Sequence, residues 1–141
     1  YLGLSATPWR TNRRESLRDV FEGLVCGPMP YQLIDSGYLV KPSYFRVTEA
    51  DLQSVGTTVS GDFDEVQLAL ACDRPELIEQ AVRDWLRLAK GRRTLCYTAN
   101  VSHARHLCEA FLAKGIPSAY VSGSTPPKQA NQIYKQLAAL E

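Results

Sequence analysis

The chain has 141 residues, 45% of them hydrophobic and 22% charged, and its 16 basic and 15 acidic side chains leave a net charge of +1. The length predicts one domain with a full core, and the composition excludes collagen-like, coiled-coil, disordered and small disulfide-rich classes. No apolar run is long enough to cross a bilayer, and the balanced charge gives no overall attraction to nucleic acid or to membranes.

Four cysteines lie in or beside apolar stretches and form no Cys-x-x-Cys pair; they occupy positions 26, 72, 96 and 108. This pattern is typical of buried free thiols in a reducing compartment, not of a disulfide framework. We therefore expect a cytoplasmic protein.

The first 48 residues predict strands and helices. Residues 1–4 are apolar and predict a buried strand. A helix is expected over 15–26 because apolar residues recur there at spacings of three and four, and a short helix over 31–36 because Pro30 suits a first turn. β-branched and aromatic residues predict a strand over 43–48.

Residues 49–73 differ from their surroundings in charge. Between positions 49 and 65 the chain has five acidic residues, two glycines and no basic residue. Such a composition predicts either an exposed surface loop or a linker between domains, and both interpretations stay open. A short helix is expected over 63–71, with Asp62 as its N-cap.

From residue 74 onward the signals alternate between helix and strand. Helices are predicted from Pro75, from Val101 behind the N-cap Asn100, and from about Lys128, with strands over 94–98 and 118–121 between them. Short strands that alternate with helices predict an α/β fold, in which helices flank a parallel sheet. The chain also starts inside a predicted strand and stops inside a predicted helix, so we expect a section of a longer protein.

Hydroxyl-bearing and small residues follow the predicted strands. In a parallel sheet the carboxyl ends of the strands form the edge where ligands bind. Small residues let backbone N–H groups approach a phosphate, and hydroxyl groups can donate to it. Two such groups follow the predicted strands over 94–98 and 118–121. Their candidate nucleic-acid contacts are Thr98 and Asn100 in the first group, and Gly123, Ser124 and Thr125 in the second.

No catalytic motif is complete in this sequence. It contains no Walker A loop, no G-x-G-x-x-G, H-E-x-x-H or G-x-S-x-G motif, and no acidic pair at a predicted strand end to hold Mg²⁺. His103, His106 and Cys108 share one predicted helix, but a helix-start histidine, a surface histidine and a core thiol explain them without zinc. We expect no catalytic residue and no metal ligand in this chain.

Four segments, in order along essentially the whole chain, resemble superfamily 2 helicases of the DEAD/DEAH-box type, in the RadD-like, phage-type and restriction-subunit-like branch. The opening YLGLSATPWR is similar to motif III, and residues 27–42 resemble the following "GP…LI..GYLV.P" segment. Residues 94–104 look like motif IV, and residues 115–126 look like the segment after it.

The resemblance implies a RecA-like, P-loop NTPase-type fold with two lobes that hydrolyse ATP with Mg²⁺ and move along single-stranded DNA. Residues 1–48 would end the first lobe, 49–73 would link the lobes, and 74–141 would start the second lobe. The residues implied in coupling between lobes are Ser5, Ala6, Thr7 and Arg10, while the main ATP and Mg²⁺ ligands would lie outside this chain. The resemblance also implies an arginine in the helix after the Gly-Ser-Thr-Pro turn, where this chain has Ala130. The contact with a phosphate or with the other lobe that this arginine would make is therefore in doubt.

Charge distribution gives this interpretation partial support. Residues 1–70 hold 6 basic and 9 acidic residues, whereas residues 71–141 hold 10 basic and 6 acidic ones. A more basic second part suits a surface that binds a nucleic-acid backbone, although scattered solvated side chains explain it equally well. Two alternatives remain: a restriction-enzyme motor subunit, and a non-catalytic α/β module that binds nucleic acid or protein.

Overall fold

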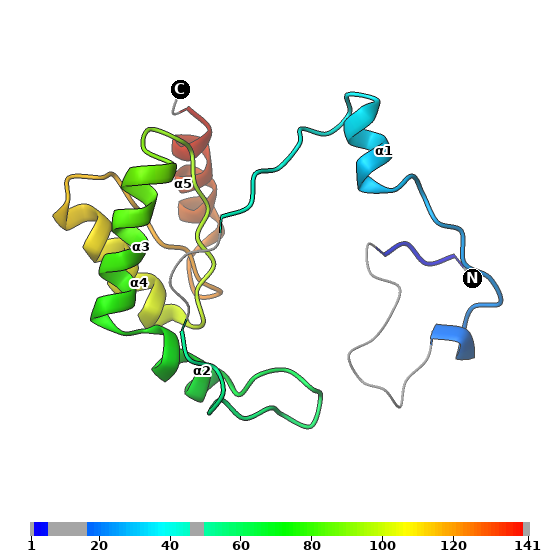
Figure 1. Ribbon diagram of the computed structural model, residues 1–141, viewed down its shortest axis with the longest axis horizontal. Coiled ribbons are helices and arrows are strands. Elements are labelled where there is room, and N and C mark those ends of the chain that lie inside the picture. Colours follow the sequence, from blue (N-terminus) through cyan, green and yellow to red (C-terminus); the bar gives the residue numbers. More distant parts are fainter. Residues whose placement is uncertain (1, 6–16, 46–49, 140–141) are drawn as a thin grey trace. The chain divides into compact units, whose positions relative to one another are not determined.

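The computed structural model describes residues 2–5, 17–45 and 50–139 (Figure 1). The chain divides into two compact units, which are described separately. The first consists of residues 1–46 and 57–62, and the second of residues 47–56 and 63–141.

Among its described residues the first unit contains a short 3₁₀ helix, η1 (Leu17–Asp19), and one α-helix, α1 (Pro30–Asp35). Pro30 occupies the first position of α1, and the Met29 N–H donates to the Gln32 side chain at 2.8 Å. Gly37 follows the helix with φ of 79°, a left-handed conformation that glycine adopts without a Cβ clash. α1 buries none of its residues, so local hydrogen bonds rather than a core hold this helix.

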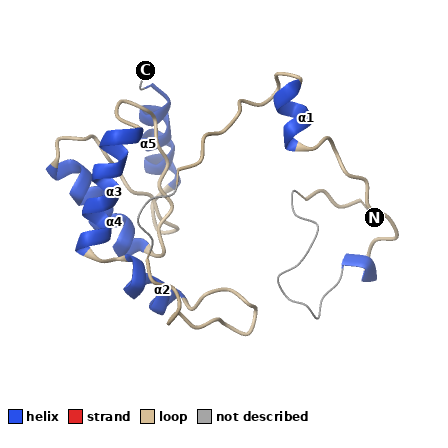
Figure 2. Ribbon diagram, in the orientation of Figure 1, coloured by secondary structure: helices blue, strands red, loops and turns tan. Residues whose placement is uncertain are grey.

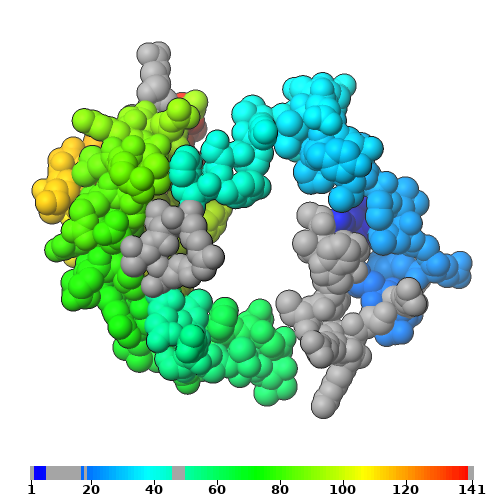
Figure 3. All heavy atoms as spheres, viewed as in Figure 1, coloured from blue at the N-terminus to red at the C-terminus, as the bar shows by residue number. Residues whose placement is uncertain are grey.

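The described part of the second unit contains four helices, α2 (Glu65–Cys72), α3 (Pro75–Leu88), α4 (Val101–Ala113) and α5 (Pro127–Ala139). In the view of Figure 3, α3 covers much of the visible face of this unit. Among the described residues, no helix is long and apolar enough to span a membrane.

The core of the second unit lies between α3 and α4. Ile78 and Val82 of α3 pack against Leu107 and Phe111 of α4, and all four side chains are buried. The Trp85 ring meets the Phe111 ring edge to face, with centroids 5.6 Å apart. These contacts come from positions spaced by four along each helix, so each helix presents one apolar stripe to the other.

A polar contact fixes the segment that follows α3. Gly91 reverses the chain with φ of 77°, and the Trp85 Nε1–H donates to Thr94 Oγ1 at 2.8 Å. Thr94 Oγ1 in turn donates to the Arg92 carbonyl at 3.0 Å. The turn therefore holds the start of the next segment against the end of α3.

The predicted α/β fold is wrong. Helix makes up 46% of the described residues, strand or bridge only 2%, and these residues form no sheet (Figure 2). The expected strands over 94–98 and 118–121 are extended but form no ladder of backbone hydrogen bonds, and Leu95 and Tyr97 are 65% and 93% exposed. The apolar stripes of α3 and α4 bury each other here and do not cover the faces of a sheet.

Most predicted helices are present, with one exception. α3 begins at Pro75 and α4 follows its N-cap Asn100, as expected, whereas α2 is capped by Asp64 instead of Asp62. The predicted helix over 15–26 is wrong in its described part, because only the three residues of η1 are helical there. The apolar side chains that predicted this helix are not packed against other residues, since Val20, Leu24 and Val25 are exposed. A short helix without such packing is not stable.

Candidate nucleic-acid interface

The residues implied in coupling between lobes fall mostly outside the described part of the chain. Ala6, Thr7 and Arg10 lie outside the described residues. Ser5 is described, and its side chain is exposed. The expected role of this group stays a prediction.

The first group of candidate contacts precedes α4. Asn100 Oδ1 accepts from the His103 N–H at 2.9 Å, which makes Asn100 the N-cap of α4. Thr98 Oγ1 donates to the Asn100 carbonyl at 3.1 Å. Both side chains are half-buried and hydrogen-bonded within the segment, so they stabilise the start of the helix in this structure.

The second group forms a hydroxyl-rich turn before α5. Thr125 Oγ1 accepts from the Ser122 N–H at 2.9 Å, and the Ser122 and Ser124 hydroxyls lie 2.9 Å apart. Gly123 is exposed, and a Cβ built there would meet no atom within 4 Å. The turn thus supplies several hydroxyl groups, close together, at the entrance to a helix.

An open cavity of about 450 Å³ lies beside this turn. Ser122, Ser124 and Thr125 line it together with Cys108 of α4 and Gln129 of α5. The lining does not include Thr98 or Asn100, and no hydrogen bond between described residues joins the two groups of candidates. The cavity therefore brings together Ser124 and Thr125 of the second group, whereas Gly123 of that group and both residues of the first group do not line it.

The first turn of α5 contributes further donors next to the hydroxyls. The Ala130 N–H bonds to the Pro126 carbonyl at 3.0 Å, so Lys128 and Gln129 lie in the first turn, where backbone N–H groups have no acceptor within the helix. The exposed Lys128 side chain adds a positive charge at the same end. Hydroxyls, free N–H groups and a cation are together able to contact the phosphates of a nucleic-acid backbone without reading its bases.

Sequence reasoning missed a histidine–carboxylate contact between α4 and the C-cap of α2. His106 Nδ1 lies 2.9 Å from both carboxylate oxygens of Asp73, which is the C-cap of α2. The two residues are 33 positions apart, so no local pattern could connect them. No group of three metal-ligating side chains occurs among the described residues, and this pair fixes one helix to another.

Desolvation changes the pKa values of one histidine and two cysteines in the second unit. Partial burial lowers the pKa of His103 below its ordinary value of 6.5, and the neighbouring Asp73 carboxylate opposes that effect. Desolvation by surrounding protein atoms also raises the pKa of the Cys96 thiol, although the residue is exposed by surface area, and of the half-buried Cys108 thiol, where the Glu109 charge adds to the effect. Both thiols are therefore protonated at neutral pH and poorly suited to act as nucleophiles.

The comparisons with known proteins identify no relative. No protein-family model, curated protein or solved structure matches this chain.

Proposed function

We propose that this chain is part of an ATP-dependent DNA helicase or translocase and supplies part of its grip on the nucleic-acid backbone. The single observation behind the proposal is the sequence itself: four helicase-like segments occur in the right order and at the right spacing. ATP and Mg²⁺ would be bound mainly by residues outside this chain.

The turn before α5 is the best-supported contact in this proposal. It lies in one of the four helicase-like segments, and it places three hydroxyl groups beside the first turn of α5. Lys128 adds the charge that a phosphate requires. By contrast, Thr98 and Asn100 are engaged in capping α4, so we expect their contribution to binding to be smaller.

The test is the binding of a labelled oligothymidine to the 141-residue chain, measured by fluorescence anisotropy. We expect weak binding that is independent of base sequence and falls at least tenfold between about 50 and 200 mM salt. Lys128→Ala should weaken binding several-fold and reduce the salt slope by about one.

Lys114→Ala is the matched control, because Lys114 is also an exposed lysine but lies at the C-terminal end of α4. This variant should bind the oligonucleotide like the unsubstituted chain. Equal losses of oligonucleotide binding in both variants would mean that binding depends on net charge and not on the position of Lys128. Absence of binding at low salt would count against the proposal as a whole.

A second candidate is a non-catalytic protein-interaction module. The observation in its favour is the large number of exposed apolar side chains in the first unit, among them Leu4 at 92%, Val25 at 97% and Val40 at 91%. Surfaces of this kind are typical of sites that a partner covers. The motor of a restriction enzyme is a variant of the first proposal, and a nuclease motif elsewhere in the full protein would identify it.

A further inference from the structure

An apolar groove of about 350 Å³ lies in the second unit between the segment after α3 and the C-terminal half of α5. We call it the Leu95 groove. It is lined by Arg93, Thr94, Leu95, Tyr134, Leu137 and Ala138. Its volume corresponds to the lower end of the range for ligand pockets, enough for one or two large side chains.

Both walls of the Leu95 groove are fixed in place. Thr94 is held by its hydrogen bond from the Trp85 indole, as described above. Arg93 Nη1 donates to the Ala138 carbonyl at 3.3 Å, which ties one wall to the other. A groove with fixed walls loses little conformational entropy when a partner binds.

The Leu95 groove is open to solvent, although its lining is mainly apolar. The side chains of Leu95 and Tyr134 are 65% and 51% exposed. Covering them would remove apolar surface from water, which favours association.

The part of the chain that supplies both walls of the groove is rich in basic residues. Residues 89–139 contain seven basic residues and one acidic residue, Glu109. The basic residues are Lys90, Arg92, Arg93, Arg105, Lys114, Lys128 and Lys135. In the described part of the chain the only ion pair of this group is Arg105 with Glu109, at 4.0 Å.

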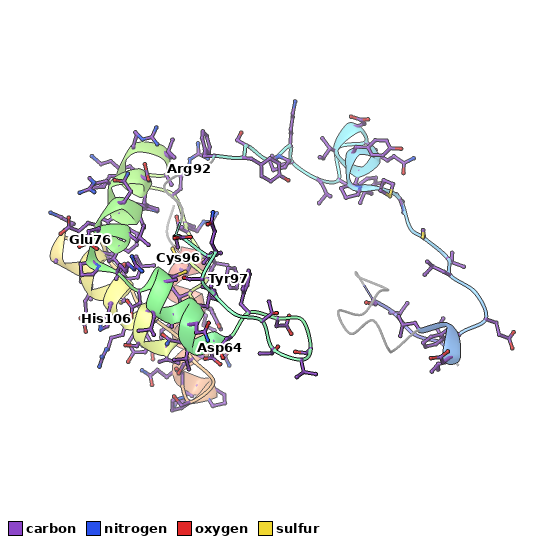
Figure 4. The ribbon with its side chains drawn as sticks, turned by 60° about the horizontal axis from the view of Figure 1, so that its bottom comes forward. Asp64, Glu76, Arg92, Cys96, Tyr97 and His106 are labelled. Atoms are coloured by element: carbon purple, nitrogen blue, oxygen red, sulfur yellow. The ribbon has the colours of Figure 1, made fainter. Side chains whose placement is uncertain are left out.

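Several of these unpaired cations lie next to the Leu95 groove in sequence. Arg92 and Arg93 directly precede Thr94, which is followed by Leu95, and Lys135 follows Tyr134. Figure 4 shows Arg92 beyond the end of α3, on the same segment as Cys96 and Tyr97. The groove therefore combines an apolar lining with the Arg93 guanidinium, and two further basic residues, Arg92 and Lys135, adjoin its lining residues in sequence.

We propose that the Leu95 groove docks a segment of a partner protein that carries large apolar side chains flanked by aspartate or glutamate. The apolar side chains fill the groove, and the carboxylates pair with Arg92, Arg93 and Lys135. A protein segment fits better than a nucleic acid, because Leu95, Leu137 and Ala138 offer aliphatic surface without the donors that contact a phosphate backbone. The docking requires neither ATP nor movement along DNA.

The test uses a labelled helical peptide of about 14 residues with Leu and Phe on one face and Asp and Glu elsewhere. A second peptide replaces its acids with lysine, a third replaces its apolar residues with alanine, and an oligothymidine serves as the nucleic-acid probe. We expect the acidic apolar peptide to bind at least tenfold more tightly than either altered peptide.

Two variants and their controls locate the binding. Leu95→Ala and Arg93→Ala should each raise the Kd for the acidic apolar peptide by about fivefold to tenfold. Leu112→Ala and Arg105→Ala are the controls, because Leu112 is 52% exposed on α4 and Arg105 is an exposed arginine on the same helix. Both controls should bind like the unsubstituted chain, and circular dichroism checks that all four variants are folded.

Three results would overturn the proposal. One is equal binding of the acidic and lysine peptides, which would remove the charge complementarity. Another is tight binding with no loss in Leu95→Ala or Arg93→Ala, which would place the site elsewhere. The third is displacement of the peptide by oligothymidine, together with weaker oligothymidine binding to the Leu95→Ala variant. That result would make the groove a nucleic-acid site.

Discussion

Half-burial of a single imidazole makes the stability of the second unit dependent on pH. His103 Nδ1 lies 3.4 Å from the Ala99 N–H and can accept from it only when that nitrogen carries no proton. Burial lowers the pKa of His103 in the folded chain, so protonation favours the unfolded state. Its contribution to stability is complete above the ordinary pKa of 6.5 and is lost as the pH falls through the lowered folded value.

We therefore expect His103→Gln to reduce the loss of stability at acid pH, because the glutamine amide binds no proton there. The measurement is the melting temperature of both proteins between about pH 7.5 and 5. The contact between Asp73 and His106 is made by residues that the substitution leaves unchanged. Identical pH profiles would show that His103 is not the group responsible.

The packing of α3 against α4 is the main source of stability at the scale of elements. Phe111 is buried on α4 and contacts both Trp85 and the α3 stripe. Phe111→Ala should lower the free energy of unfolding by about 3 kcal/mol, because it removes apolar contacts and leaves a cavity. Urea denaturation monitored by circular dichroism measures the change.

The neighbouring Leu112 provides the comparison for that substitution, since its side chain is 52% exposed. Leu112→Ala should cost less than about 1 kcal/mol. Similar losses in the two variants would mean that α4 packs through a different face.

Hydrogen exchange distinguishes the observed helices from the predicted sheet. The amides of 95–97 form no backbone hydrogen bond in this structure, so they should exchange fast, whereas the amides of 107–111 should be protected. In the segment 54–60 the Gly56 N–H donates to Gln67 Oε1 at 2.7 Å and the Thr58 N–H to the Asp62 carbonyl at 2.7 Å, so the other amides of this segment should also exchange fast. Slow exchange at 95–97, comparable to that at 107–111, would be incompatible with the helical fold described here.

At this scale the sequence predicted helices better than strands, for a physical reason. A helix satisfies its own backbone, so Pro75 and Asn100 were sufficient to locate the starts of α3 and α4. A strand needs a partner, and the apolar runs near Leu95 and Tyr120 carry no information on whether one is present. The contact between His106 and Asp73 and the Leu95 groove were not predicted either, because both join residues that are distant in sequence.

At the scale of the whole molecule, we expect the isolated chain to hydrolyse no ATP. Phosphoryl transfer depends on positioned cations and a phosphate-binding loop, and the sequence contains no Walker A motif. A phosphate-release assay with ATP and Mg²⁺ should give the rate of the blank. Magnesium-dependent turnover that Thr7→Ala abolishes would contradict this expectation and would show that the chain holds a complete site.

The hydrogen bond between Trp85 and Thr94 has a practical consequence, since the chain has only two tryptophans, Trp9 and Trp85. In a Trp9→Phe background, all indole fluorescence would come from a side chain that touches the core on one side and the wall of the Leu95 groove on the other. Its emission wavelength would report unfolding of the second unit without an added label. Filling of the groove beside Thr94 would change its quenching by iodide, so one intrinsic signal could follow both folding and docking.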